Sequence, residues 1–164
     1  MEITGRVLKY GDNINTDLII PSKYLVFIAP QELAKHAMAG IDEDFPRKVE
    51  GGKILVAEKN FGSGSSREQA PVALKYAGVK CILADSFARI FYRNAINIGL
   101  PVIEYEGISQ MVSNDDELHI NLEKGTIENV SKQTRLQMNP IPEFLLQIME
   151  RGLVEYMRGK DETL

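Results

Sequence analysis

The chain has 164 residues, of which 44% are hydrophobic and 26% are charged, a composition typical of a folded globular protein. Its length suits a single domain with its own core, so we expect one domain over residues 1–164. The 19 basic and 23 acidic side chains leave a formal net charge of −4. This balance excludes the broad positive surface that binds nucleic acids or anionic membranes, although a local site can still bind a small anion.

The single cysteine, Cys81, excludes an internal disulfide, and one thiol cannot hold a zinc ion or an iron–sulfur cluster by itself. It lies in an apolar run that predicts a buried strand, where a thiol behaves as a small hydrophobic group. The first residues lack the apolar core of a signal peptide, and no segment has the length of a membrane span. We therefore expect a soluble cytoplasmic protein with no nucleic-acid or membrane partner.

The amino-terminal part predicts a strand, two connections and a helix. Residues 3–8 alternate weakly between apolar and polar side chains, as in a strand, and residues 11–17 are rich in turn formers and predict a loop. Residues 24–29 are unusually apolar for a connection. Pro30 then opens a predicted helix that ends at Gly40.

From residue 53 onward, strands alternate with helices. The expected order is a strand at 53–57, a loop at 60–66, a helix from Glu68 or Gln69 to Ala77, a strand at 79–84, a helix capped by Ser86 and ending at Gly99, and a strand at 100–105. This alternation is typical of an α/β fold with mostly parallel central strands and flanking helices.

The carboxyl-terminal part predicts a hairpin followed by two short helices. Residues 118–122 and 126–130 flank a glycine-containing turn and predict the hairpin. The two helices are expected at 142–149 and 153–157, and residues 159–164 are expected to fray.

The segment that carries chemical information is the glycine- and serine-rich loop at residues 60–69. A strand runs into this loop and a helix follows it, so free N–H groups and the positive end of the helix dipole gather at one place. Arg67 adds a planar donor suited to a carboxylate or phosphate, and Ser65 and Ser66 add hydroxyls. The loop therefore predicts an anion site.

Two other interpretations of this loop stay open at the level of the residues. One is that Ser65 or Ser66 is only a helix cap beside a glycine turn, because serine is a favoured cap residue. A phosphate loop is less well supported, because the segment lacks the Gly-Lys-Ser/Thr ending of such loops.

Three motifs occur in the order found in a known family. Residues 64–68, Gly-Ser-Ser-Arg-Glu, resemble the hallmark of the swivelling domain of the aconitase superfamily, and the segments at 86–91 and 94–99 are similar to the family's next helix. Residues 12–21 resemble the amino-terminal motif of isopropylmalate isomerase small subunits. The resemblance covers nearly the whole chain and implies a swivelling β/β/α fold.

The resemblance also implies a reaction, a partner and residue roles. Small subunits of this family act with a large subunit that holds a four-iron, four-sulfur cluster, and the pair interconverts 2-isopropylmalate and 3-isopropylmalate by dehydration and rehydration in leucine biosynthesis. By resemblance, Ser65 is the catalytic base, acting as an alkoxide, while Arg67 holds a carboxylate of the dicarboxylate substrate and Ser66 adds a hydrogen bond. Thr16 and Asp17 match a Thr-Asp pair at the substrate site, where Asp17 has a positioning role; its alternative is a turn aspartate.

Substrate choice is expected to depend on Val26 and Phe27. These residues align with a loop that carries arginine in relatives acting on homoaconitate-type substrates, which have a third carboxylate. An apolar wall suits an isopropyl group, whose burial contributes about 2 kcal/mol. The alternative is instead that Val26 and Phe27 anchor the loop to the core.

Two other functions remain open. One is a homoaconitase-type or broad-specificity subunit that also acts on methylmalate or citraconate, since a pocket for isopropyl rejects a methyl group only modestly. The other is a non-catalytic anion-binding domain. The remaining polar residues receive no chemical role: His36 and His119 are expected at the surface or in packing, and Arg89 and Arg93 as solvated charges or partner contacts.

Overall fold

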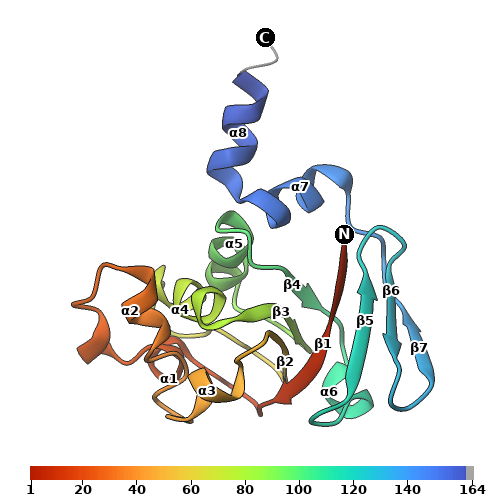
Figure 1. Ribbon diagram of the computed structural model, residues 1–164, viewed down its shortest axis with the longest axis horizontal. Helices are drawn as coiled ribbons and strands as arrows, with labels where there is room; N and C mark the ends of the chain where they lie inside the picture. Colours follow the sequence, from red (N-terminus) through yellow and green to blue (C-terminus); the bar gives the residue numbers. More distant parts are fainter. Residues whose placement is uncertain (162–164) are drawn as a thin grey trace.

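The computed structural model describes residues 1–161, and its strands form one seven-stranded sheet in the order β4-β3-β2-β1-β5-β6-β7 (Figure 1). The strands are β1 Glu2–Lys9, β2 Lys53–Ala57, β3 Val79–Ala84, β4 Val102–Glu104, β5 Glu117–Asn121, β6 Thr126–Asn129 and β7 Thr134–Gln137. The sheet has two halves, because β1 to β4 pair in parallel while β1, β5, β6 and β7 pair antiparallel.

The helices gather beside the parallel half of the sheet and at the carboxyl terminus (Figure 1). They are α1 Thr16–Ile19, the short 3-10 helix η1 Ser22–Tyr24, α2 Pro30–Ala34, α3 Phe45–Lys48, α4 Gln69–Ala77, α5 Arg89–Asn97, α6 Ile108–Met111, α7 Glu143–Arg151 and α8 Leu153–Asp161. Helix α8 extends away from the body (Figure 1). The tail expected to fray from residue 159 is helical as far as Asp161, and residues 162–164 lie outside the described residues.

The parallel half confirms the central prediction of the sequence. Strands β2 and β3 are apolar and buried except at Lys53 and Lys80, as expected for parallel strands covered on both faces. Helix α4 joins them and ends at Gly78, whose φ of +117° lies in the left-handed region that closes helices. The α/β alternation therefore follows from residue patterns that are local in the sequence.

The helix that begins at Pro30 is shorter than predicted. Helix α2 ends at Ala34, and only turns continue to Gly40. The reason is tertiary, because the N–H of Met38 donates to the carbonyl of Ile19 at 2.7 Å and the N–H of Gly40 donates to the carbonyl of Leu18 at 3.0 Å. These bonds take the amides that a continuing helix would use.

The predicted cap at Ser86 is wrong. Helix α5 begins three residues later, at Arg89, and Ala88 at its N-cap position makes no side-chain cap bond. The hydroxyl of Ser86 instead accepts a hydrogen bond from the N–H of Asn60 at 2.8 Å. The chain stays extended here because Phe61 and Phe87 form a parallel β-bridge beyond the ends of β2 and β3.

The antiparallel half contains the predicted hairpin, β5 and β6, and a further strand, β7, that the sequence analysis missed. Strand β7 lies at the edge of the sheet and is mostly exposed, so it lacks the apolar alternation that marks the other strands. The loop predicted at residues 11–17 is also shorter than expected, because helix α1 begins at Thr16. The side chain of Asn15 caps this helix by accepting a hydrogen bond from the N–H of Leu18 at 3.0 Å.

A buried carboxylate, Asp116, connects the segment before β5 with the end of β6 and the turn that follows it. The side chain of Asp116 accepts hydrogen bonds from the N–H of Ser113 at 2.8 Å and from the amide of Asn129 at 2.7 Å, and Lys132 lies 3.5 Å away. Burial acts to raise the pKa of Asp116, but these donors and the Lys132 charge outweigh it and hold the pKa below its usual range.

We predict that Asp116→Asn lowers the free energy of unfolding by about 1–3 kcal/mol near neutral pH. Because the folded-state pKa is depressed, the stabilisation by Asp116 is complete above the unfolded-state value of about 3.9 and is lost as pH falls through the folded-state value. Urea unfolding at about pH 7 and about pH 3 checks this, with the exposed Glu50→Gln as control. An equal difference between variant and wild type at both pH values would contradict it.

Candidate active site

The loop between β2 and α4 lies at the carboxyl edge of the parallel sheet, next to the connection between β3 and α5. The N–H of Phe61 donates to the carbonyl of Ser86 at 3.0 Å, and the N–H of Ala88 donates to the carbonyl of Phe61 at 2.9 Å. Because parallel strands end at one edge, the connections that follow them meet there. The loop that the sequence singled out therefore faces the start of α5.

Gly62 makes this approach possible. Its φ is +79°, and a Cβ atom at this position would lie 2.1 Å from Cγ of Phe91, on α5. Real side chains do not approach so closely, so any larger residue must displace the loop or the helix. The ring of Phe91 also packs edge-on against Phe61, with centroids 5.2 Å apart. The glycine thus sets the separation between the loop and α5.

A second segment, residues 14–17, holds the other side of the loop. The N–H of Gly62 donates to the carbonyl of Ile14 at 2.8 Å, and the N–H of Thr16 donates to the carbonyl of Ser63 at 2.9 Å. The hydroxyl of Thr16, a buried residue, donates to the carbonyl of Ser65 at 3.0 Å. Its oxygen lies 3.3 Å from Oγ of Ser65, and either hydroxyl can be the donor in that contact.

Arg67 is held in place by two hydrogen bonds to the segment at residues 17–20. Its Nη1 donates to Oδ1 of Asp17 at 2.6 Å and to the carbonyl of Ile20 at 2.9 Å. The Arg67 side chain is 17% exposed and that of Asp17 is 66% exposed, so the aspartate approaches from the solvent side. An exposed ion pair contributes little to stability, and its effect here is to fix the direction of the guanidinium.

A cleft of about 210 Å³ lies between the loop and α5. Ser65, Ser66, Arg67 and Thr16 all contribute to its wall, and both serines are exposed. In the described part of the chain, the backbone N–H groups of Ser65 and Ser66 donate no hydrogen bond. The cleft therefore combines hydroxyls, free amides and a guanidinium, which is a suitable set for a carboxylate.

Two polar residues of the cleft were not predicted. Arg89 and Asn94, on α5, line the wall opposite the loop, whereas Arg89 was expected to be a solvated charge or a partner contact. The pattern that could have found them is the succession of two parallel strands, since the first turn after the second strand must lie beside the loop after the first.

Val26 and Phe27 do not line this cleft. The ring of Phe27 stacks on His36, with centroids 5.5 Å apart, and His36 also stacks on Tyr24 at 3.8 Å. Phe27 thus anchors its loop, and His36 has the packing role that the sequence suggested. The side chain of Val26 is instead 76% exposed.

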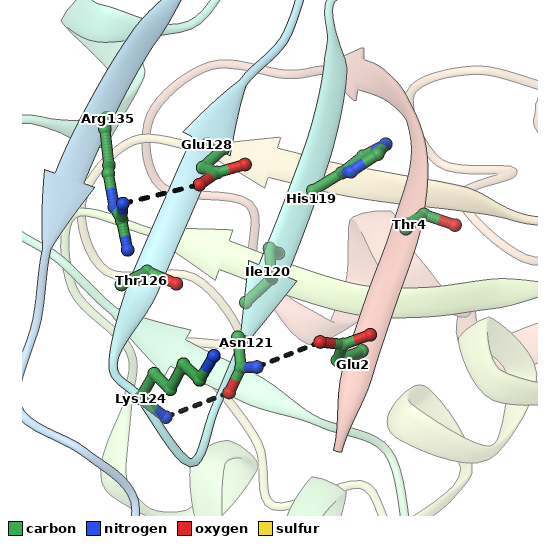
Figure 2. Close-up of a pocket in the computed structure, with 9 residues that line it drawn as sticks. All are labelled: Glu2, Thr4, His119, Ile120, Asn121, Lys124, Thr126, Glu128 and Arg135. Atoms are coloured by element: carbon green, nitrogen blue, oxygen red, sulfur yellow. Dashed lines mark hydrogen bonds and ion pairs between the residues drawn. The ribbon is translucent and has the colours of Figure 1, made fainter.

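A second hollow, of about 170 Å³, lies on the antiparallel half of the sheet (Figure 2). Some of its polar side chains pair with one another: Asn121 donates to Glu2 at 3.0 Å, and Arg135 lies 3.7 Å from Glu128. Figure 2 shows these groups on strands β1, β5, β6 and β7, none of which carries a residue of the loop. The hollow is therefore separate from the candidate site.

The described residues do not include a group of three or more His, Cys, Asp or Glu side chains that could hold a metal ion. Cys81 is fully buried in β3, and burial raises the pKa of its thiol. Among residues 1–161, no helix has both the length and the apolar character required to cross a membrane.

Comparison with known proteins decides the family. Residues 29–108 match the Aconitase C-terminal domain. The isopropylmalate/citramalate isomerase small subunit of Methanocaldococcus jannaschii is 54% identical over 159 residues, which cover 96% of this chain and 95% of that protein. The 3-isopropylmalate dehydratase small subunit of Halothermothrix orenii is 51% identical over 97% of each chain. This chain belongs to the family of 3-isopropylmalate dehydratase small subunits.

The fold agrees with this family. The crystal structure of 3-isopropylmalate dehydratase from Methanocaldococcus jannaschii superposes with a TM-score of 0.92 at 45% identity, over 99% of this chain and 97% of that chain. The resemblance stated from the three sequence motifs is thereby confirmed, as is the expected swivelling α/β fold of the aconitase superfamily.

We predict that Gly62→Ala lowers the free energy of unfolding by about 2–4 kcal/mol, from backbone strain and overlap with Phe91 together. Urea unfolding measures the change. Gly11→Ala is the matched control, because a Cβ atom there has no neighbour within 4 Å. A Gly62→Ala protein as stable as the control would show that the loop is not pressed against α5.

Proposed function

We propose that the chain is the small, substrate-holding subunit of a two-subunit hydro-lyase that interconverts 2-isopropylmalate and 3-isopropylmalate in leucine biosynthesis. The observation that carries this proposal is the convergence of Ser65, Ser66 and Arg67 on one cleft, in a chain that is 51% identical to a 3-isopropylmalate dehydratase small subunit. The reaction loses and regains water across two adjacent carbons, so it needs a base and donors for a carboxylate that gains charge.

Ser65 is the proposed base. A serine hydroxyl is a weak acid, so its alkoxide needs nearby donors. The structure supplies them in the hydroxyl of Thr16, 3.3 Å from Ser65 Oγ, and in the free amides of the loop. The Thr16 hydroxyl can donate its hydrogen bond to the carbonyl of Ser65 while the Ser65 side chain is neutral. It can rotate to donate to Oγ of Ser65 when that oxygen is charged. The start of α4 adds a further favourable field.

Arg67 is the proposed carboxylate ligand. A guanidinium has five N–H donors, and Asp17 and Ile20 both bind Nη1 of Arg67. The N–H groups of the other two nitrogens therefore stay available for a substrate oxygen. Because the side chain is already oriented, little conformational entropy is lost when the carboxylate binds. Asp17 thus acts through Arg67 as a positioning residue, while Ser66 adds a hydroxyl at the same wall.

The proposal requires a large subunit. The described residues of this chain do not fit an iron–sulfur cluster, since Cys81 is buried and no metal-binding group is present among them. We assign the four-iron, four-sulfur cluster to the partner, where it would supply the Lewis acid for departure of hydroxide. The proposed location is the cytoplasm, whose reducing conditions suit a chain with one unpaired thiol.

Val26 and Phe27 keep a proposed role in substrate choice. They come shortly after η1, and η1 begins two residues after Ile20, whose carbonyl accepts a hydrogen bond from Arg67. The exposed apolar side chain of Val26 is suited to cover an isopropyl group once the large subunit closes the site. A broader function is the second candidate, because the relative at 54% identity is named an isopropylmalate/citramalate isomerase small subunit.

We predict that turnover of isopropylmalate requires both chains and falls by at least about 10³-fold in Ser65→Ala, because the base is lost. The test combines the chain with candidate large subunits under anaerobic conditions and follows the unsaturated intermediate. Ser63→Ala is the matched control, since Ser63 belongs to the same loop but does not line the cleft.

The substrates separate the alternatives. Turnover of citramalate at a rate comparable to that of isopropylmalate supports the broader function, and turnover of homocitrate alone removes the role given to Val26 and Phe27. If no cluster-loaded partner gives any turnover, the chain is a non-catalytic anion-binding domain.

A further inference from the structure

Arg89 is a free cation at the wall of the proposed active site. It is exposed and lines the cleft opposite Ser65 and Ser66. Within residues 1–161 it forms no ion pair and no side-chain hydrogen bond, whereas Arg67 is bound by Asp17 and Ile20. Of the two arginines at the cleft, Arg89 is therefore the one with all of its donors available.

The position of Arg89 is not explained by the stability of the fold. It is the first residue of α5, where the helix dipole disfavours a positive charge. Its neighbour Ile90 is 53% exposed and lines the same cleft, so this turn of the helix presents both a cation and an apolar side chain to the site. An anionic ligand with an apolar substituent matches that pair.

We propose that Arg89 binds the second carboxylate of the substrate. The inference rests on the proposed function, because a malate-type substrate carries two carboxylates and Arg67 can bind only one of them at the loop side of the cleft. Arg67 lines the cleft from the loop and Arg89 lines it from α5, so each side of the cleft carries one cation for a carboxylate. Arg89 is thus a substrate-binding residue rather than a solvated charge.

Arg93 provides a matched control. It lies one turn further along α5, is also exposed, and forms no ion pair in the described chain, but it does not line the cleft. Loss of either arginine removes one positive charge from the same helix. An effect found only in Arg89→Ala is therefore an effect of position in the cleft.

The test uses the reconstituted two-subunit enzyme. We expect Arg89→Ala to raise KM for isopropylmalate about tenfold to hundredfold, the cost of one lost charge-assisted hydrogen-bonded contact, with a smaller change in kcat. Arg89→Lys should recover part of the loss, and Arg93→Ala should leave KM unchanged. The affinity between the subunits, measured by sedimentation, should be the same in all variants.

Competitive inhibitors locate the contact. Succinate has two carboxylates and butyrate has one on a chain of the same length, so Arg89→Ala should weaken inhibition by succinate and leave butyrate unchanged. Equal weakening of both inhibitors, an unchanged KM, or a loss confined to subunit affinity would each overturn the proposal while leaving the subunit assignment intact. Absence of turnover in the wild-type complex would overturn the proposed function and this inference with it.

Discussion

The site depends on the parallel pairing of β2 with β3, which continues past both strands to the bridge between Phe61 and Phe87. This pairing forces the two following connections to lie side by side at one edge of the sheet. One connection carries the serines and Arg67, and the other begins α5. Gly62 lets the two come into contact, because no side chain separates the loop from Phe91. The cleft is therefore a product of the sheet rather than of the loop alone.

The electrostatic problem of such a site is to keep charged groups ready without burying them unpaired. Arg67 meets it by pairing with Asp17 at its solvent side while its other donors remain available. Ser65 stays exposed and neutral, with the hydroxyl of Thr16 within reach. Both supports come from residues 14–20, so a segment far away in the sequence orients the loop for the proposed ligand. Preorganised donors of this kind are the ones that stabilise charge as it develops.

The local parts of this arrangement could be predicted from the sequence. The buried runs of β2 and β3, helix α4 and the glycine- and serine-rich loop before α4 depend on neighbouring residues, and Gly78 marks the helix end. The long-range parts could not. The length of α2 is set by amide bonds to Ile19 and Leu18, and Ser86 bonds to Asn60 instead of capping α5. Such competition between a local preference and a distant partner leaves no trace in a single sequence.

The proposed assistance of Ser65 by the hydroxyl of Thr16 can be measured through kcat of the reconstituted enzyme that carries Thr16→Val. Valine keeps the shape of the buried threonine and removes only the hydroxyl, whereas Thr16→Ser keeps the hydroxyl. We expect a loss of about a hundredfold in kcat for the valine variant, as for removal of one preorganised donor, and near wild-type kcat for the serine variant. A Thr16→Val enzyme with wild-type kcat would contradict it.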